Sequence, residues 1–450
     1  MRMSGLDLQS CTAGRWRGEP PVMVSGIATD TRKLRRGEAF VALRGPNFDG
    51  HSFAVEAASL GAVALIGDAE GLASWQGEAP PRLLVDDSLQ ALGDIAAGWR
   101  STLSLPVVAI TGSYGKTTLR SMLEHVLAHK GKRVTATRSN DNNLIGVPQT
   151  LLRINPSDDV AVIECGISEA GEMRRLAGMV RPDVAVITGV AAAHAEGLGS
   201  LAGVAAEKAI LLEALAAGGC GILGMGVSAL LDHSGPQADV EILDMDAPGN
   251  DGAVGWRMDG NTVTLSLCNE SVQFNASLPA THWAQDAALA ATVLHRLGLA
   301  TLAEVGKAMQ SWQAVNGRML SLPGTGGSIL LDDSYNANPA SMQAALDTLR
   351  RMPGRRIAVL GDMAELGRDS KALHAGLDIR ELDAVLLVGE EMRALAPLHA
   401  GVRHVETSEQ ALREALAMHP GKGDTLLIKG SRCMHMEQVV NGLREAGDAV

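Results

Sequence analysis

The sequence predicts an α/β protein of three units, in which mainly parallel sheets are covered by helices. Short apolar runs typical of buried strands alternate with helix-like stretches along most of the chain. Its 450 residues are more than one domain usually holds. The 51 glycines fit the many tight turns of such a fold. We place the units at residues 1–104, 105–318 and 319–450.

Composition argues against several classes of protein. The formal net charge is −12 without a long basic run, so we expect no nucleic-acid partner. The five cysteines are scattered and form no Cys-x-x-Cys pair, which argues against a disulfide framework or zinc site and fits a reducing cytoplasm. Because no signal peptide and no stretch of about 18 apolar residues occurs, we expect a cytoplasmic protein without a membrane span.

The first unit mixes short strand-like runs with turn signals. One run covers 39–43, and the sequence FAVEAASLGAVALIG predicts a helix, a glycine stop and then a strand. Four polar residues lie in its predicted loops, where binding sites often occur: Asp30, Arg32, Asn47 and His51. Ordinary solvated loop polarity is the alternative reading of these residues.

The central unit begins with a candidate phosphate-binding loop, in the sequence VVAITGSYGKTTLRSM. An apolar strand is followed by a glycine-bearing turn and the start of a helix, whose free N–H groups and dipole favour an anion. Lys116 would reach the outer phosphates, and the Thr117 hydroxyl suits Mg2+. The alternative is an ordinary turn with a surface lysine. The expected nucleotide-binding set is Gly112, Ser113, Gly115, Lys116, Thr117 and Thr118.

Three further polar residues of the central unit follow predicted strands. Those strands are expected at 160–163, 184–187 and 221–223, in βαβ order. Glu164 ends the first, His194 follows the second, and Lys208 lies on the next helix. Because ligands bind at the carboxyl ends of parallel strands, this group suits metal-assisted phosphoryl chemistry. Taken singly, Glu164 and His194 could equally be a surface acid and a loop residue.

The third unit repeats the α/β pattern. SILLDDSYNANPASMQAALDTL predicts a strand, a polar loop and a helix, and three further apolar runs predict strands. A Rossmann-like domain is the simplest interpretation, although no Gly-x-Gly-x-x-Gly sequence supports a dinucleotide.

Six motifs, spread over nearly the whole chain, carry a family resemblance. TGSYGKTT, NNLIGVPQTLL, AAAHAEGLGSLAGVA, LLDDSYNANPASM, LGDMAELG and IKGSRCMHMEQVV resemble the Mur ligase family. This implies ATP-dependent joining of an amine to a carboxylate through an acyl phosphate. The third-unit motifs resemble the branch that joins D-alanyl-D-alanine to UDP-N-acetylmuramoyl-tripeptide in peptidoglycan precursor synthesis. The resemblance further implies Mg2+, a uridine-nucleotide-binding first domain and a P-loop ATPase-like central domain. We expect a monomer.

The resemblance also implies roles for individual residues. Thr117, Glu164 and His194 would hold Mg2+, and Lys208 matches a lysine that is carbamylated in several family members. Residues implied at the ATP are Lys116, His282, Arg318 and Asp333. Residues implied at the substrates are Thr31, Arg32, Asn47, His51, Asn143, Asn336, Asn338, Ser341 and Lys429. Domain closure would bring Arg318 and Asp333 onto ATP, so we expect an open form without ligand.

The central unit departs from the family pattern where asparagines usually lie near the adenine. Trp283 and Asp286 stand in their place, and Thr188-Gly189 replaces another asparagine pair. One hypothesis is a rebuilt adenine site in which Trp283 stacks on the base. Another is a divergent ligase that acts on a different carboxylate and amine. A third is a nucleotide-binding paralogue without turnover, against which the retained phosphate and metal residues argue.

Overall fold

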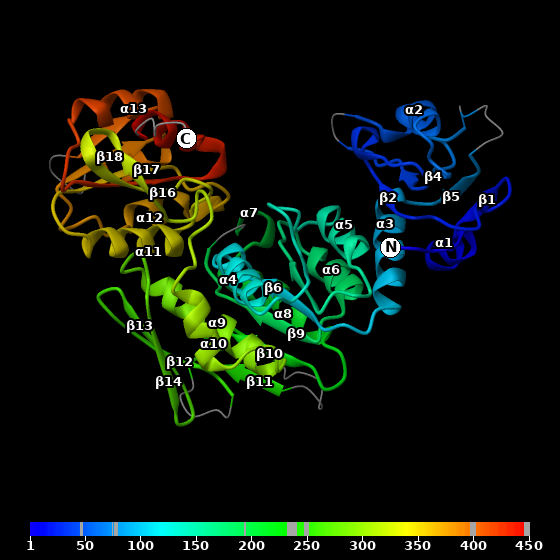
Figure 1. Cartoon of the computed structure of the whole chain (residues 1–450). Helices are drawn as coiled ribbons and strands as arrows, with labels where there is room; N and C mark the ends of the chain where they lie inside the picture. Colours follow the sequence, from blue (N-terminus) through cyan, green and yellow to red (C-terminus); the bar gives the residue numbers. More distant parts are fainter. Residues whose placement is uncertain are drawn as a thin grey trace.

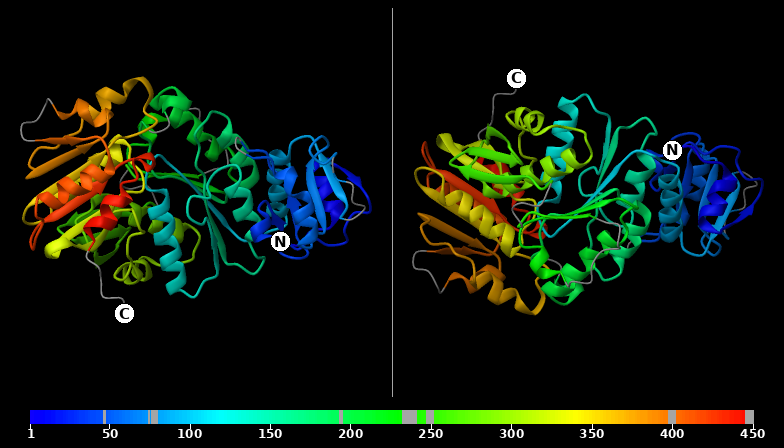
Figure 2. Two further views of the ribbon diagram at one scale, coloured as in Figure 1. Left: turned by 90° about the horizontal axis from the view of Figure 1, so that it is seen from above. Right: turned by 90° about the horizontal axis from the view of Figure 1, so that it is seen from below.

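The computed structural model describes residues 1–45, 48–73, 75, 80–192, 195–231, 241–246, 252–396 and 402–444. It shows three α/β units in a bent row, with the first and third units on opposite sides of the central one (Figure 1). Two further views show the first unit standing apart at one end of the row (Figure 2). The predicted α/β class with three units is confirmed.

The first unit holds a five-stranded sheet in the order β1-β5-β4-β3-β2, in which β1 alone pairs in the antiparallel sense. Its elements are α1 (Gly5–Thr12), β1 (Arg15–Arg17), β2 (Ile27–Ala28), β3 (Ala39–Val41), α2 (Ala54–Ser59), β4 (Ala64–Asp68), β5 (Arg82–Val85) and α3 (Ser88–Ser101). Helix α2 stops before Gly61, whose φ of 94° is left-handed, and β4 follows. The helix, glycine and strand predicted here are therefore present.

Helix α3 connects the first unit to the central one. Its Trp99 indole donates to the carbonyl of Ile154 at 3.2 Å, and the Arg100 guanidinium donates to the carbonyl of Val180 and to Asp183. These contacts are buried, so the helix belongs as much to the core of the central unit as to the first. The boundary at residue 104 stays a prediction, as does the one at 318.

The central unit is built on a six-stranded, fully parallel sheet in the order β11-β10-β9-β6-β8-β7. Its strands are β6 (Val107–Thr111), β7 (Val134–Ala136), β8 (Val160–Glu164), β9 (Val184–Ile187), β10 (Cys220–Leu223) and β11 (Glu241–Asp244). Its helices are α4 (Lys116–His129), α5 (Gly146–Arg153), α6 (Glu172–Val180), α7 (Ala195–Leu198) and α8 (Leu201–Glu213). The strands predicted from apolar runs are all present. Helices bury both faces of this sheet, which explains why its strands are apolar along their length.

A small antiparallel sheet and two helices complete the central unit. They are β12 (Gly255–Asp259), β13 (Thr262–Leu267), β14 (Glu270–Asn275), α9 (Thr281–Arg296) and α10 (Leu302–Met309). Alternating burial along β13 shows that one face of this sheet packs on the core and the other faces solvent. Helix α9 packs against α4, which places it beside the predicted phosphate loop.

The third unit has a six-stranded sheet in the order β15-β16-β20-β17-β18-β19. Its elements are β15 (Leu320–Gly324), β16 (Ser328–Asp333), α11 (Pro339–Arg350), β17 (Arg356–Gly361), α12 (Ser370–Ala375), β18 (Ala384–Val388), β19 (Arg403–Val405), α13 (Ser408–Ala417), β20 (Thr425–Lys429) and α14 (Glu437–Leu443). The edge strand β15 is antiparallel, which the Rossmann-like prediction did not include, and all other pairs are parallel.

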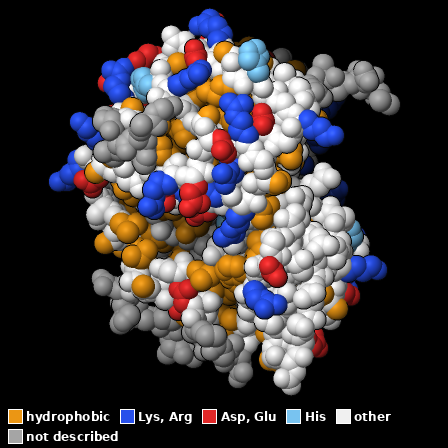
Figure 3. All heavy atoms as spheres, turned by 90° about the vertical axis from the view of Figure 1, so that its left-hand side faces the viewer, with side chains coloured by type: hydrophobic (Ala, Val, Ile, Leu, Met, Phe, Trp, Pro, Cys, Tyr) orange, Lys and Arg blue, Asp and Glu red, His pale blue; other side chains and the backbone are white. Residues whose placement is uncertain are grey.

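The third unit contacts the central one directly, and the expectation of an open form without ligand stays a prediction. The Asn338 side chain at the start of α11 donates from Nδ2 to the carbonyl of Ser113 at 2.9 Å. Seen from the side of the third unit, hydrophobic side chains border a hollow between the upper and lower parts of the molecule (Figure 3).

Among the described residues, none of the helices has the length and apolar character needed to cross a membrane.

Candidate functional site

The loop between β6 and α4 has the backbone shape that the sequence predicts. Gly112 has φ 150°, and a Cβ there would lie 2.0 Å from the Thr188 hydroxyl oxygen. Gly115 caps α4 in the left-handed region at φ 82°. No other residue type fits these two positions without strain. The loop therefore presents the free N–H groups of the α4 start at the carboxyl end of a central strand.

Lys116 and Ser113 fix the conformation of this loop. The Lys116 Nζ donates to the carbonyl of Gly112 at 2.6 Å, so the side chain folds back over the loop. Burial lowers the pKa of Lys116 to about 8, although nearby Glu164 opposes the shift. The Ser113 backbone N–H donates to Gly189, and its hydroxyl donates to Ala191, at 2.8 and 3.1 Å. The loop is held against the segment that follows β9.

Glu164 and Thr117 lie side by side beneath the loop. Glu164, at the end of β8, is 0% exposed, and the Thr117 hydroxyl donates to its Oε2 at 3.2 Å. The other oxygen, Oε1, accepts from the Arg120 Nε at 2.6 Å. Arg120 also bonds Glu124, one turn further along α4. Hard oxygen donors from Thr117 and Glu164 are of the kind that Mg2+ prefers.

Lys208 is a buried amine in the same region. It lies on α8 and is 1% exposed. Burial lowers its pKa to about 7, and the positive charge of Lys116 adds to the shift. The adjacent Glu207 accepts from the backbone N–H of Gly171 and of Met173, and so ties α8 to the start of α6. An amine with this pKa is uncharged in about half of the molecules at neutral pH.

Three charged side chains lie near the loop, one at the junction with the third unit and two within that unit. The Arg318 guanidinium stacks on the Tyr335 ring, 4.1 Å from its centroid, and burial lowers the pKa of the arginine. Lys429 and Asp333 form a buried ion pair with an Nζ–Oδ2 distance of 2.7 Å. Lys429 also donates to the carbonyl of Asn336 at 2.9 Å. All three charged side chains line one cavity together with the phosphate loop.

The polar loop before α11 mainly stabilises its own helix. The Asn338 Oδ1 accepts from the Ser341 backbone N–H, and the Ser341 hydroxyl accepts from the Asn338 N–H, which makes a capping box. Because its Nδ2 also donates to the carbonyl of Ser113, both ends of the Asn338 side-chain amide are hydrogen-bonded within the protein. Asn336 is exposed and lines the cavity.

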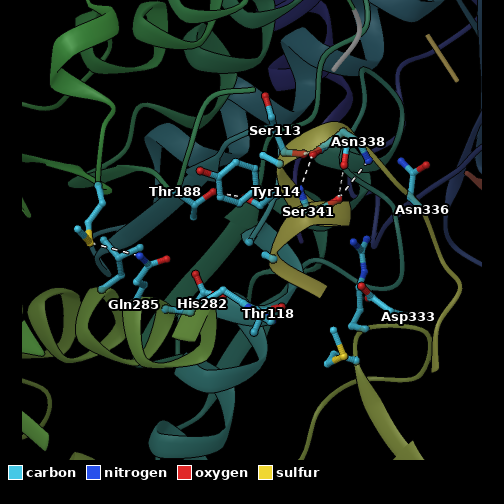
Figure 4. A pocket seen from close by; sticks show the side chains of 18 of the residues that line it. Ser113, Tyr114, Thr118, Thr188, His282, Gln285, Asp333, Asn336, Asn338 and Ser341 are labelled. Carbon is cyan, nitrogen blue, oxygen red and sulfur yellow. Dashed lines mark hydrogen bonds between the residues drawn. The ribbon is translucent and has the colours of Figure 1, made fainter. Parts of the chain in front are cut away.

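Polar side chains of both the central and the third unit line the cavity between them (Figure 4). Four apolar side chains line it as well, and we call this part its apolar end: Met225, Met245, Trp256 and Leu289. Two polar groups from α9 also line the cavity: the buried His282 Nδ1 has no hydrogen-bond partner within the described part of the chain, and Asp286, 6% exposed, lies beside Gly115. Burial lowers the pKa of His282 to about 4 and raises that of Asp286 well above its usual value.

Trp283 does not line this cavity, which contradicts the predicted stacking. Its side chain is 3% exposed and meets Trp312 edge-on, with ring centroids 5.1 Å apart. Because α9 turns by 100° per residue, neighbouring positions 282 and 283 face different ways. Trp256, on the small antiparallel sheet, is the tryptophan that lines the cavity.

Several predicted substrate residues lie far from the cavity or in structural roles. His51 is 5% exposed and contacts Asp49 and Asp68 through its two ring nitrogens, so it acts as a clamp within the first unit. Thr31 is buried, and Arg32 is exposed and paired with Asp30. The Asn143 Oδ1 accepts from two N–H groups at the start of α5. Asn47 and His194 lie outside the described residues.

Sequence reasoning missed three residues of the site: Tyr114, Arg120 and Trp256. Arg120 lies three residues after Thr117 and therefore on the same helix face, a spacing that could have revealed it. Tyr114 sits within the loop itself, where burial raises the pKa of its hydroxyl. Trp256 carries no sequence signal, because only the fold brings its strand to the cavity. Within the described ranges no group of three or more His, Cys, Asp or Glu side chains could hold a metal.

Comparison with known proteins agrees with this geometry. Three family models match: the Mur ligase family catalytic domain at residues 23–100, the Mur ligase middle domain at 110–294 and the Mur ligase glutamate ligase domain at 317–432. The chain is 36% identical over 436 residues to the UDP-N-acetylmuramoyl-tripeptide–D-alanyl-D-alanine ligase of Escherichia coli K12, covering 95% of each. The chain belongs to the Mur ligase family.

Solved structures of Mur ligases have the same arrangement. MurF from Acinetobacter baumannii superposes with a TM-score of 0.87 at 27% identity, over 98% of each chain. MurF from Thermotoga maritima, solved in complex with ADP, superposes with a TM-score of 0.81 at 26% identity, over 93% of this chain and 96% of that one. These similarities support the three-unit Mur ligase architecture along the whole length described above.

Proposed function

We propose that this chain is an ATP-dependent ligase that joins D-alanyl-D-alanine to UDP-N-acetylmuramoyl-tripeptide, with release of ADP and phosphate. The observation that carries the proposal is a cavity lined by both the phosphate loop and the third unit. It places Arg318, Asp333 and Lys429 opposite the loop that bears Lys116. The similarity to ligases of this name over 95% of the chain gives the substrates.

The phosphates of ATP would lie on the phosphate loop. The N–H groups of the α4 start, Lys116 and Arg318 would stabilise the charge that develops on the transferred phosphoryl group. The tripeptide carboxylate would receive that group as an acyl phosphate. The amine of D-alanyl-D-alanine would then displace phosphate and form the amide.

The base of ATP would occupy the apolar end of the cavity. Its flat faces suit Trp256, Met225 and Met245, because every base has a π-face that packs on such side chains. The unpartnered His282 Nδ1 and the Asp286 carboxyl would offer hydrogen bonds to a base edge. This assignment replaces the predicted stacking on Trp283.

Mg2+ fits the oxygens of Thr117 and Glu164, where it would neutralise phosphate charge. Lys208 supports a carbamate, since its amine is buried and has a pKa of about 7. The neutral amine would attack CO2, forming an N–C bond and losing a proton. The carbamate would add an anionic oxygen ligand next to the loop.

The remaining parts of the proposal rest on the family. The first unit would hold the uridine nucleotide, and the loop around Asn336 would face the D-alanyl-D-alanine. The enzyme would act in the cytoplasm as a monomer, without nucleic acid.

ADP release by the purified protein tests the function. We expect release that requires ATP, Mg2+, the UDP-N-acetylmuramoyl-tripeptide and D-alanyl-D-alanine together, and that is abolished in Lys116→Ala. Release that persists without either substrate, or ATP binding without any release, would contradict the ligase assignment.

A further inference from the structure

Arg120 stands out as a buried charge to which the proposed chemistry assigns no role. Its side chain is 11% exposed and lies on α4, one turn beyond Thr117. It makes two ion pairs, through Nε with Glu164 and through a terminal nitrogen with Glu124. Glu124 is half-buried, whereas the Glu164 side chain is 1% exposed. Arg120 therefore joins a surface carboxylate to a fully buried one.

Glu164 depends on such a partner. A buried carboxylate loses its hydration, and a paired cation or hydrogen-bond donors must replace it. The Arg120 Nε meets Oε1 at 2.6 Å and leaves Oε2 directed at the Thr117 hydroxyl. The Glu164 backbone is fixed as well, because its N–H donates to the Thr137 hydroxyl at 2.8 Å. One carboxylate oxygen is thus occupied, and the other is held beside Thr117.

We propose that Arg120 is a positioning residue for the divalent cation: it holds Glu164 in one rotamer, with Oε2 paired to Thr117 as a ready two-oxygen cation site. The inference rests on the proposed function, since it assigns these two oxygens to Mg2+. It gives Arg120 no contact with ATP or with either substrate. Its effect passes entirely through Glu164.

Removal of Arg120 would change cation binding in opposite directions, depending on whether Arg120 competes with the cation or positions Glu164, and this makes the inference testable. If Arg120 merely competed with the cation for Glu164, its removal would tighten cation binding. If it positions the carboxylate, removal leaves Glu164 free to rotate and poorly compensated, and cation binding weakens. Loss of a group that orients a metal ligand typically weakens metal binding by roughly 10- to 100-fold.

The experiment measures Mn2+ binding by electron paramagnetic resonance, in the presence of ADP, for the full-length protein. We expect Arg120→Met to weaken Mn2+ binding at least tenfold, while ADP binding in EDTA changes less than twofold. Arg120→Lys keeps the positive charge but places it on a single nitrogen instead of the arginine fork. We therefore expect a smaller loss of Mn2+ affinity than in Arg120→Met. Because Lys preserves charge and size, it serves as the informative variant if the Met protein does not fold.

Arg100→Met is the matched control. The Arg100 side chain is 10% exposed, close to the 11% of Arg120, and bonds Asp183 away from the loop. We expect it to lower the melting temperature and leave Mn2+ binding unchanged. Unchanged or tighter Mn2+ binding in both Arg120 variants overturns the inference. If the wild-type protein with ADP binds no Mn2+ at all, the metal-assisted ligase proposal itself fails, which is a distinct outcome.

Discussion

Replacing Trp283 by alanine separates the two roles that a tryptophan beside His282 could play. In the structure Trp283 is a core residue, 3% exposed, packed against Trp312. The Trp312 indole in turn donates to the Ser121 hydroxyl on α4 at 3.2 Å. The substitution should therefore destabilise the central unit and leave the cavity wall intact.

The size of the effect follows from these contacts. Trp→Ala in a core costs about 3–5 kcal/mol, and the lost edge-on pair with Trp312 is part of that cost. In a unit of 150–250 residues each kcal/mol shifts the melting temperature by about 2–4 °C. We therefore expect Trp283→Ala to lower the melting temperature by about 6–20 °C.

Trp256→Ala is the comparison. Trp256 is half-buried on an edge strand of the small sheet and lines the cavity. Loss of a stacking surface costs about 1–3 kcal/mol, which is roughly a 5- to 150-fold weaker affinity for ATP. Its melting temperature should fall less than that of Trp283→Ala.

We compare the two variants by calorimetric melting and by titration with ATP at a temperature where both are folded. We expect Trp283→Ala to lose stability without losing ATP affinity. We expect Trp256→Ala to lose ATP affinity with a smaller loss of stability. A Trp283→Ala protein of normal stability with weakened ATP binding would refute the reasoning and restore the stacking hypothesis.

Three further predictions concern Asp286, Lys208 and Asn338. Burial raises the pKa of Asp286 in the folded state above its value in the unfolded chain. The native state therefore keeps a proton that the unfolded chain releases, and stability falls as pH rises between the two pKa values. The melting temperature of Asp286→Asn should therefore rise relative to that of the wild type as pH increases above about 4, and a pH-independent difference would contradict this. Removal of CO2 should lower the activity of the wild type, and added bicarbonate should restore it, whereas the activity of Lys208→Arg should not respond to either. NMR with 13C-bicarbonate should show a carbamate carbon only in the wild type. Asn338→Asp keeps the helix-capping oxygen but loses the donor to Ser113, so KM for ATP should rise with little change in stability, whereas Asn338→Ala should cost about 1 kcal/mol as well. An unchanged KM for ATP in both variants would show that the contact with Ser113 contributes nothing.

The sequence predicts the local geometry of the site well, where one short segment determines it. The phosphate loop needs only a buried strand, two glycines with positive φ and a helix start, and all of these follow each other in the chain. The same holds for Glu164 at the end of β8, since an apolar run ending in an acid already marks the strand end. Both predictions depend on contacts that are local in sequence.

What the sequence could not predict depends on contacts between distant segments. Nothing near Trp256 shows that its strand crosses to the cavity, and nothing near Trp283 shows that Trp312, 29 residues on, covers it. The contact between the central and third units likewise joins residues far apart in the chain, as in the hydrogen bond between residues 113 and 338. The structural role of His51 could not be predicted either, because one of its two carboxylate partners, Asp68, is brought to it only by the fold.

Detection of the ligated product by mass spectrometry tests the central claim most directly. The purified protein, given ATP, Mg2+, UDP-N-acetylmuramoyl-tripeptide and D-alanyl-D-alanine, should convert the tripeptide into a species heavier by one D-alanyl-D-alanine less one water. Lys116→Ala, folded but without the phosphate-loop ammonium, should yield none. Absence of this product from the wild type, with ATP bound and the protein folded, would contradict the account.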